Sequence, residues 1–435
     1  MSDDGFIKIA DLMESPSVKK CKPKFSDILD WVANNDKKRF QIRIEPKSDK
    51  ISLENGYIRA SQGHTMKGIE EEKLLTKITF PYKYPTIVHG TYSKVLAPIQ
   101  EKGLCKMQRN HIHMAKGYAG DKDVISGMRG TCDLYIEVNL AKAIKDDIPI
   151  YISANDVILT GGKDGYLGPE YFRKIVNKKG NLIYSAKLDY IVVFDFEAIC
   201  DKDGNDKFEV QEIIEFPAVV IDCKQKKIIK AFQTYVKPQK YPDLTEFWTE
   251  LTGITQEQVD GGVPIEEAVL MFHKFLKDAG VLGSEFAMMS CGDYDAKALK
   301  REAEFKKFFV PSYMKEWINI KKVFPLHKYD SEVEEKKIDK IKKVRPVVKG
   351  MTDMLEKCSL DLLGRHHSGI DDSFNIARWV VKTLEDDFNY EQSHINSVNY
   401  ETTDDKAIEF EQRLIEDKIE IPEIDCEAHL ESMIK

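Results

Sequence analysis

The segment that most constrains the fold is Tyr190–Glu197, with the sequence YIVVFDFE. Its first five residues are apolar or aromatic, and an unbroken run of this kind predicts a strand buried on both faces of a sheet. Side chains alternate between the faces of a strand, so Asp195 and Glu197 should point the same way. Two adjacent carboxylates at the end of an apolar strand repel each other and are costly to dehydrate. The pair indicates either a site for Mg²⁺ or Mn²⁺, which prefer oxygen ligands, or a strand end with two solvated acids.

The length and the cysteines limit the class of protein. A chain of 435 residues should contain two or three domains. It has no apolar run long enough to span a bilayer, and its first residues, MSDDGFIKIADL, contain no signal-peptide hydrophobic region. The 8 cysteines are scattered without a C-x-x-C pair, which is typical of reduced thiols and not of a disulfide framework or a zinc site. We expect a monomer in the cytoplasm, the nucleus or both, neither secreted nor membrane-bound.

The formal net charge of −8 hides an uneven distribution. Residues 384–435 contain 16 acidic and 4 basic residues, whereas the preceding 383 residues contain 57 acidic and 61 basic ones. The acidic composition is therefore no argument against a nucleic-acid partner for the body of the chain. Residues 385–435 are too acidic and too poor in aromatic residues to be expected to fold alone, and they are interpreted as an acidic C-terminal tail.

The pattern of apolar residues changes along the chain. The first half begins with two short helical patterns, FIKIADLM and FSDILDWVAN, and then is dominated by strands. The second half alternates strands with amphipathic helices such as IEEAVLMFHKFLK and SFNIARWVVKTL, which predicts an α/β domain. The polar sequence NKKGN at 177–181 marks a boundary. We therefore predict domains at residues 1–177 and 187–384, followed by the tail at 385–435.

Three further residues in the second half could complete a metal site with Asp195 and Glu197. SCGDYD places Asp295 at the opening of a helix, and HHSGIDDS places His367 five residues before Asp372. Four carboxylates can hold two divalent ions about 4 Å apart, which is the two-metal arrangement for phosphodiester cleavage. A histidine beside such a site is suited to take the proton from an attacking water.

The motifs of the second half resemble a known family. DFEA, EIIEFP, YVKP, LTGITQEQVD, CGDYD, WINIKK, MLEKC and GRHHSGIDDSFNIAR occur, over residues 188–384, in the order of the DEDDh 3′–5′ exonucleases. They are most similar to the branch that trims the ends of histone mRNA, ribosomal RNA and small interfering RNA. The resemblance implies a ribonuclease-H-like fold with a mixed central sheet and His367 as general base. It implies two Mg²⁺ or Mn²⁺ ions with four ligands: Asp195, Glu197, Asp295 and Asp372.

The same resemblance implies that lysines and arginines around the groove follow the RNA backbone. Lys321 and Lys322 in WINIKK are candidates for this role, and the alternative is an ordinary solvated pair after a strand. The lysine- and glutamate-rich insertion at 327–349 departs from the family pattern, and it leaves open how the substrate enters on that side.

The first half contains basic and histidine-bearing loops beside glycines. Arginine suits phosphate oxygens, and glycine allows a backbone to approach a ligand closely. His111 and His113 could form a metal pair, but no third ligand follows at a convincing spacing. The candidate residues and their motifs are Arg59 and His64 in IRASQGHT, His89 in HGT, Arg109 in MQRNHIH and Arg129 in SGMRG.

These motifs resemble the RNA 2′-phosphotransferase family, which is similar to ADP-ribosyltransferases. The matching segments, over residues 4–175, are DGFIKIADLM, KRFQI, IRASQGHT, HGTY, GLCKMQRNHIHM, ISGMRG and IYISANDVILTGGKDGYLGPEYF. That family transfers a splice-junction 2′-phosphate from tRNA to NAD. The resemblance implies a winged-helix-like lobe followed by an ADP-ribosyltransferase-like lobe. It also implies residue roles: Arg59 and Arg129 in catalysis, Gln62 and His64 in RNA binding, and His89, Gly90 and Thr91 in NAD binding.

One departure from that family bears on activity. Its members begin with a helix that carries a Leu-Arg-His motif essential to the chemistry, and this sequence starts at DGF, after that helix. We therefore expect weak or no removal of a 2′-phosphate by the chain as written, either because it is truncated or because this half is not catalytic. The leading hypothesis is an RNA-processing fusion of an exoribonuclease with a 2′-phosphotransferase-like domain, acting on RNA 3′ ends and on 2′-phosphorylated tRNA. In the alternative, the first half is a non-catalytic RNA- or NAD-binding module that delivers RNA to the exonuclease.

Overall fold

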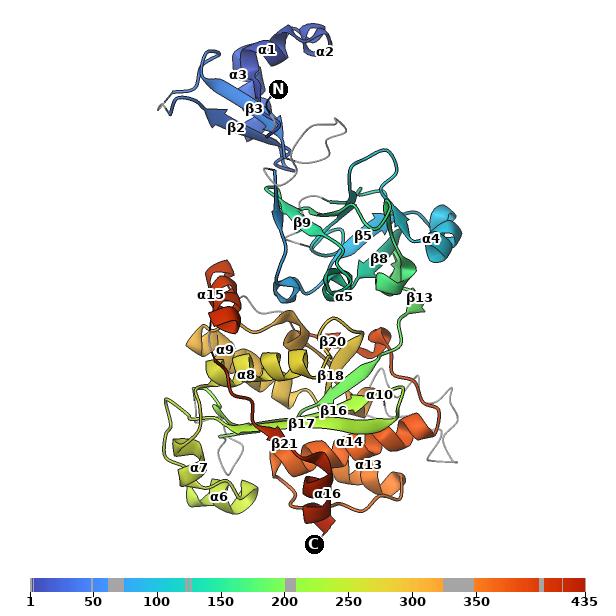
Figure 1. Cartoon of the computed structure of the whole chain (residues 1–435), viewed down its shortest axis with the longest axis vertical. Coiled ribbons are helices and arrows are strands. Elements are labelled where there is room, and N and C mark those ends of the chain that lie inside the picture. Colours follow the sequence, from blue (N-terminus) through green and yellow to red (C-terminus); the bar gives the residue numbers. More distant parts are fainter. Residues whose placement is uncertain are drawn as a thin grey trace. The chain divides into compact units, whose positions relative to one another are not determined.

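The computed structural model describes the chain except residues 1, 3, 48–49, 62–73, 122–123, 125–126, 200–208, 324–347, 399–402, 417 and 435. The chain forms two compact units, Met1–Tyr184 and Ser185–Lys435 (Figure 1). The division lies between residues 177 and 187, where the sequence predicts the first domain to end and the second to begin.

Unit 1 begins with a small sheet of three strands in the order β1-β3-β2. Phe25, Ile28 and Val32 recur at helical spacing, so FSDILDWVA forms a helix that buries one face against Ile9 and Ile58. The elements are β1 (Ile7–Lys8), α1 (Ile9–Glu14), α2 (Pro16–Lys19), α3 (Phe25–Ala33), β2 (Phe40–Ile44) and β3 (Gly56–Ala60).

The rest of unit 1 consists mainly of two four-stranded sheets, in the orders β4-β9-β10-β7 and β13-β12-β8-β5, with β11 paired to β6. All five residues of β8 are buried, and this strand lies between β12 and β5. The strands are β4 (Leu75–Lys77), β5 (Val88–Thr91), β6 (Leu104–Cys105), β7 (Ile112–Met114), β8 (Leu134–Val138), β9 (Ile150–Ser153), β10 (Ile158–Thr160), β11 (Tyr166–Leu167), β12 (Phe172–Asn177) and β13 (Leu182–Ser185). The helices are α4 (Leu96–Lys102) and α5 (Leu140–Lys145).

Unit 2 is built around one mixed sheet in the order β20-β19-β18-β14-β16-β17-β21, with β15 paired to β16. Strand β14 runs parallel to β18 and antiparallel to β16. This architecture agrees with the predicted α/β class and mixed central sheet. The strands are β14 (Tyr190–Val193), β15 (Glu197–Ala198), β16 (Ile213–Asp222), β17 (Lys227–Tyr235), β18 (Phe286–Ser290), β19 (Glu316–Asn319), β20 (Asn396–Ser397) and β21 (Glu423–Ile424).

Helices cover both faces of this sheet. In Figure 1, α8 and α9 lie on one face, and α13 and α14 lie on the other. The helices of unit 2 are α6 (Glu246–Thr252), α7 (Gln256–Asp260), α8 (Ile265–Asp278), α9 (Tyr294–Lys306), α10 (Ile320–Val323), α13 (Met351–Lys357), α14 (Gly369–Glu385), α15 (Asp404–Glu416) and α16 (Cys426–Ile434).

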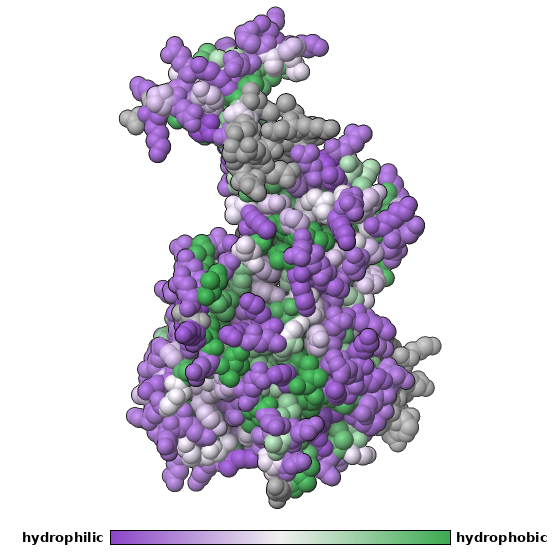
Figure 2. Space-filling view, viewed as in Figure 1, coloured by the Kyte–Doolittle hydropathy of each residue, from purple (hydrophilic) through white to green (hydrophobic). Residues whose placement is uncertain are grey.

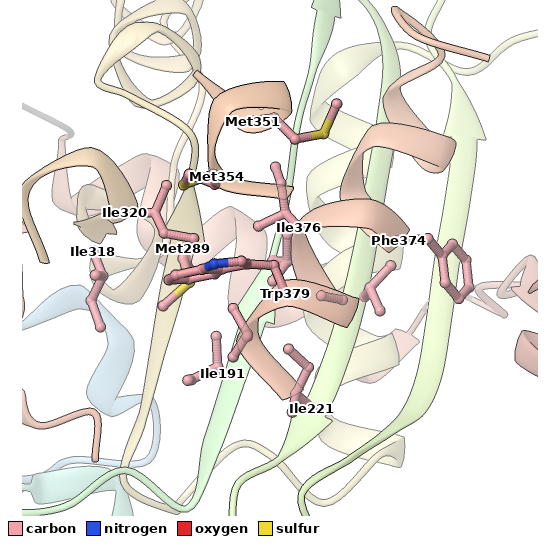
Figure 3. Packing of buried hydrophobic residues seen from close by; sticks show 14 of the residues in the cluster. Ile191, Ile221, Met289, Ile318, Ile320, Met351, Met354, Phe374, Ile376 and Trp379 are labelled. Atoms are coloured by element: carbon pink, nitrogen blue, oxygen red, sulfur yellow. The ribbon is translucent and has the colours of Figure 1, made fainter. Parts of the chain in front are cut away.

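Trp379 of α14 lies at the centre of the core beneath the sheet. Figure 3 shows its indole among Ile191, Met289 and Ile320, and its Nε1 donates to Sγ of Cys358 at 3.0 Å. The side chain is fully buried. The same helix begins at the candidate active site, so the packing of Trp379 fixes where that helix lies.

Replacing Trp379 by alanine should lower the free energy of unfolding of unit 2 by about 4 kcal/mol, because it removes buried apolar surface and leaves a cavity. Urea unfolding of the full chain measures this change. Ile415→Ala is the control, because Ile415 is 78% exposed and its truncation should change the stability by less than about 0.5 kcal/mol. Equal effects of the two substitutions would contradict the assignment of Trp379 to the core.

The segment 385–435 differs from the expected tail. Two of its strands extend the central sheet, because β20 pairs with β19 and β21 pairs with β17. Phe410 of α15 is buried and packs against Phe309 at a ring distance of 5.2 Å, and Met433 of α16 belongs to the main core. The segment therefore buries its apolar side chains against the rest of unit 2.

Hydrophilic side chains cover most of both units on the face shown in Figure 2. In the described part of the chain, no helix combines the length and the apolar character that crossing a membrane requires.

Candidate active site

The central strand and its acids form the first part of the site. Ile191–Val193 are fully buried, as predicted, but β14 ends at Val193 and Glu197 begins β15. The sequence predicted one continuous strand. The strand is interrupted where the N–H of Phe196 donates to Oδ1 of Asp295 at 3.0 Å. This hydrogen bond ties Asp295, the second residue of α9, to the segment between Asp195 and Glu197.

Asp372 belongs to the first turn of α14 and is buried. Its Oδ2 accepts the backbone N–H of His367 at 3.0 Å and lies 3.0 Å from Nδ1 of His366. The two imidazole rings are stacked with their centroids 4.0 Å apart. His367 has a backbone φ of +66°, which is uncommon for a residue other than glycine, and the bond to Asp372 helps to hold it.

These residues converge although they come from distant parts of the sequence. Among the described residues, potential metal-ligating atoms lie within 4.8 Å of one another in two groups that share Asp372. The first group is Asp195, Glu197 and Asp372, and the second is His366, His367 and Asp372. The first group offers only carboxylate oxygens, which are the donors that Mg²⁺ and Mn²⁺ prefer.

The electrostatics of the cluster fit a site for cations. Burial, and then repulsion from neighbouring carboxylates, raises the pKa of Glu197 to about 9 and holds the pKa of Asp195 well above its usual range. Burial likewise raises the pKa of Asp295 to about 6 and raises the pKa of Asp372. A cation among these groups would offset their mutual repulsion, so the donor set fits divalent metal ions.

Glu215 was not singled out from the sequence, although it lies in the motif EIIEFP. It is buried on β16 opposite Glu197, and its two oxygens accept the backbone N–H groups of Gly369 at 3.0 Å and Ile370 at 3.1 Å. Its Oε1 also accepts Nε2–H of Gln233 at 2.8 Å. Because Gly369 and Ile370 open α14, Glu215 fixes the end of the helix that carries Asp372. An acidic residue inside an apolar strand sequence is the signal that could have identified it.

The two candidate lysines have different surroundings. Nζ of Lys322 forms an ion pair with Asp293 at 3.1 Å, and Asp293 also accepts Nδ2–H of Asn319 at 2.7 Å. Burial raises the pKa of Asp295, and the charge of Lys321 offsets part of that rise, so this ammonium group acts on the carboxylate cluster. Lys322 is therefore paired with Asp293, whereas the charge of Lys321 acts on Asp295.

Arg59 lies on β3 in the first part of unit 1. Its Nη1 donates to the carbonyl oxygen of Asp4 at 2.9 Å, and its Nε donates to Oε1 of Gln41 at 2.6 Å. The ring of Phe6 lies close to two guanidinium groups, 4.5 Å from that of Arg59 and 4.1 Å from that of Arg43. The motifs DGF, KRFQI and IRA thus meet at one place.

The HGT motif lies on β5, in the second part of unit 1. Nδ1 of His89 donates to the carbonyl oxygen of His113 at 2.9 Å, and burial lowers the pKa of His89. A Cβ on Gly90 would lie 3.0 Å from Cβ of Met128 and 3.1 Å from Sγ of Cys132, so a glycine allows this close approach. Thr91, the last residue of the strand, is buried.

The remaining residues predicted for unit 1 are placed as follows. Arg129 has an exposed side chain and lies before β8. His111 and His113 are both buried, and Nδ1 of His113 donates to the carbonyl oxygen of His111 at 3.0 Å. Both groups of potential metal ligands found among the described residues lie in unit 2. Gln62, His64 and most of the insertion at 327–349 lie outside the described residues.

Comparison with protein families assigns both halves of the chain. Residues 1–162 match the family described as "RNA 2'-phosphotransferase, Tpt1 / KptA family", and residues 192–380 match the family described as "Exonuclease".

Individual relatives match one half each. The first half is similar to a "Putative tRNA 2'-phosphotransferase" of Schizosaccharomyces pombe, with 37% identity over 42% of this chain and 48% of that protein. The second half is similar to "3'-5' exoribonuclease 1" of Rattus norvegicus, with 36% identity over 49% of this chain and 58% of that protein. The chain thus spans about half the length of these curated relatives.

Among solved structures, the second half is similar to the nuclease domain of 3'hExo, described as a DEDDh family member bound to rAMP. The identity is 34% over 46% of this chain and 93% of that one, with a TM-score of 0.39. The structure of a 3'-exonuclease in "3'-end specific recognition of histone mRNA stem-loop" has 32% identity over 49% of this chain and 92% of that one, with a TM-score of 0.40. The chain therefore combines a domain of the RNA 2′-phosphotransferase (Tpt1/KptA) family at residues 1–162 with a domain of the exonuclease family at residues 192–380.

Proposed function

We propose that the domain at residues 187–384 hydrolyses RNA from its 3′ end with two divalent ions, Mg²⁺ or Mn²⁺. The observation that carries the proposal is the convergence of Asp195, Glu197 and Asp372 within 4.8 Å, with Asp295 linked to them through Phe196. Buried carboxylates that repel one another are costly for a fold, and their persistence here is explained by a function that uses them.

Each residue has a distinct role in this proposal. Asp195, Glu197, Asp295 and Asp372 would hold the ions, which when bound supply activation of water and stabilisation of the departing oxygen. His367 takes the proton from the attacking water. Its main chain is fixed by the N–H bond to Asp372, and burial together with the neighbouring His366 lowers its pKa, which favours the neutral form that can accept a proton.

The direct test is to incubate the full chain and Mg²⁺ with RNA labelled at its 5′ end. Successive shortening of the labelled strand supports a 3′–5′ exonuclease. Immediate release of a short labelled product would contradict a 3′–5′ exonuclease. A labelled strand that stays intact with both Mg²⁺ and Mn²⁺ would also contradict it.

We expect Lys321→Ala to raise the KM for RNA about five- to tenfold, whereas Lys322→Ala should raise it less than twofold. The charge of Lys321 acts on the catalytic carboxylates, while that of Lys322 is paired with Asp293. The dependence of log affinity on log salt should become shallower by about 0.7 for Lys321→Ala, as expected for the loss of one phosphate contact. Steady-state hydrolysis measures KM, and titrations of RNA binding at several salt concentrations measure the slope. Equal slopes for the two variants would contradict the distinction.

For residues 1–177 we propose binding of NAD and of RNA carrying a 2′-phosphate, such as 2′-phosphorylated tRNA. Arg59 and Arg129 would contact phosphate groups, and His89, Gly90 and Thr91 would line the NAD site. The guanidinium groups of Arg59 and Arg43 lie together against Phe6, and a phosphate there would compete with Asp4 and Glu45, the acidic partners of Arg43.

We expect Arg129→Ala to weaken binding of a 2′-phosphorylated RNA by the full chain about tenfold, and to leave binding of the same RNA without the phosphate unchanged. Fluorescence anisotropy measures the affinities, with Lys179→Ala, an exposed lysine near the end of the unit, as the control. Equal losses for the two RNAs would contradict phosphate recognition by Arg129. Transfer of the phosphate to added NAD would distinguish an active transferase from a module that only delivers RNA.

A further inference from the structure

The last described segment of the chain, β21 with α16, is attached to the exonuclease domain at two places. Strand β21 extends the central sheet beside β17, and Lys230 forms an ion pair with Glu423 at 2.6 Å across that pairing. Helix α16 places Met433 in the main core, with Leu430 packed against the same cluster. The helix therefore has a defined position on the domain.

Helix α16 also contacts the loop that carries His367. We call residues Gly364–Ser368 the histidine loop. The carbonyl oxygen of Met433 accepts the N–H of Gly364, the first residue of this loop, at 3.0 Å. Nε2 of His429 donates to Oδ1 of Asp371 at 2.9 Å, and the His429 ring lies 4.7 Å from the ring of Phe374.

Asp371 connects His429 to the histidine loop. Its second oxygen, Oδ2, accepts the backbone N–H of Arg365 at 2.8 Å. Gly364 has a φ of +65°, and a Cβ there would lie 2.5 Å from the same oxygen, so the loop closes tightly over Asp371. The neighbouring Asp372 holds the other end of the loop through the N–H of His367.

The histidine loop is thus held at two ends by two adjacent carboxylates, and α16 supports only one of them. Both aspartates lie in the first turn of α14, but only Asp371 also accepts a hydrogen bond from His429 of α16. The side chains of His429 and Asp371 are 20% and 15% exposed, so water competes only weakly for their hydrogen bond. Loss of His429 would leave Asp371 free to turn toward solvent and would loosen the loop at Arg365.

We propose that His429 is a positioning residue for the exonuclease, which acts through Asp371 and the histidine loop to hold His367 in place. The inference rests on the proposed function of His367 as general base. Groups that orient a catalytic or ligating side chain typically contribute 10- to 100-fold to activity, and their loss affects the chemical step. Helix α16, which the composition assigned to an acidic tail, would then be part of the catalytic apparatus.

The experiment compares three substitutions of His429 in the full chain, with RNA hydrolysis measured as kcat and KM separately. His429→Ala should lower kcat about tenfold and change KM less than twofold. His429→Phe, which keeps a ring against Phe374 but has no donor, should lower kcat by a similar factor. His429→Gln keeps an N–H that can reach Asp371 and should restore kcat to within about threefold of the parent.

Two further variants separate the possible outcomes. Glu431→Ala changes an exposed residue of the same helix and should leave kcat unchanged. Asp195→Asn should be inactive, and its full activity would contradict the proposed exonuclease site itself. Suppose that Asp195→Asn is inactive but His429→Phe cleaves at the parent rate and is folded, as judged by its melting temperature. The exonuclease site is then correct, and the positioning role of His429 is wrong. Failure of His429→Gln to restore kcat lost in the other two would also overturn it.

Discussion

Asparagine at position 195 should lower the rate of RNA hydrolysis about a thousandfold or more without unfolding the protein. Asp195 lies beside Glu197 and Asp372, and the neutral amide oxygen of asparagine is a weaker ligand for a divalent ion than a carboxylate. Loss of one ligand removes several kcal/mol of stabilisation from the transition state, and each 1.36 kcal/mol corresponds to a factor of about ten in rate. Single-turnover digestion of labelled RNA with excess protein measures the chemical step.

In the absence of metal, the substitution Asp195→Asn should maintain or increase the stability of the protein. Burial, and then repulsion from Asp295, Asp372 and Glu197, holds the pKa of Asp195 well above its usual range, so its ionised form is disfavoured in the folded protein. The neutral asparagine removes that repulsion. The melting temperature of the metal-free Asp195→Asn protein should therefore equal or exceed that of the parent.

Asp293→Asn is the matched control, because Asp293 lies two residues before Asp295 and outside the carboxylate cluster. Its oxygens bind Asn319, Trp317 and Lys322, and asparagine retains one acceptor for them. This variant should keep at least a tenth of the parent activity. Equal losses at positions 293 and 195 would mean that the loop and not the cluster is responsible.

The convergence of the acids was the part of the site most accessible from the sequence. The buried run before Asp195 fixes a central strand, and acids at the openings of later helices tend to reach the same sheet edge. The order of motifs added the spacing between His367 and Asp372. The motif spacing did not predict the break between β14 and β15. This break depends on a hydrogen bond from Phe196 to Asp295, about a hundred positions away.

The C-terminal segment was harder to interpret because average composition conceals short apolar patterns. Cys426, Leu430 and Met433 recur at spacings of four and three, which is the pattern of a helix with one buried face. Strand β21 has only two residues and owes its conformation to its partner β17. Elements of this length are set by tertiary contacts, so propensity alone could not predict them.

The charged residues show a second limit of sequence patterns. Lys321 and Lys322 are neighbours, yet only Lys322 forms the ion pair with Asp293. A sequence reports that charges are present but not how they are paired, since pairing follows from side-chain direction. Arg59 illustrates the same point, because its contacts with Asp4 and Phe6 join segments that lie more than fifty positions apart.

Glu215→Ala should lower RNA hydrolysis about a hundredfold, the second largest effect expected here. Glu215 accepts the N–H groups of Gly369 and Ile370, the first two residues of α14. Gly369 also packs so closely on the segment between β14 and β15 that a Cβ there would lie 2.5 Å from the carbonyl oxygen of Asp195. The end of α14 is thus fixed against the segment between β14 and β15 that carries Asp195, and releasing it should displace Asp372.

Loss of Glu215 should also destabilise the fold, because two buried N–H groups lose their acceptors. Each unsatisfied buried group costs about 1–3 kcal/mol, so the free energy of unfolding should fall by about 2 kcal/mol or more. Glu215→Gln keeps one acceptor oxygen and should lose only about tenfold in rate. Urea unfolding and single-turnover hydrolysis measure the two effects on the same preparations.

Gln233→Ala is the control for Glu215→Ala. It removes a hydrogen bond to Glu215 but keeps the hydrogen bonds between Glu215 and α14. Gln233 donates to Oε1 of Glu215 at 2.8 Å, but it makes no part of the link between Glu215 and the two N–H groups. Its truncation should therefore change the rate less than threefold. If Glu215→Ala instead cleaved RNA within threefold of the parent while losing stability, the carboxylate would support the fold without positioning Asp372. If the end of α14 sets the geometry of the metal site, Glu215→Ala should lose both rate and Mg²⁺ affinity. Gln233→Ala should lose neither.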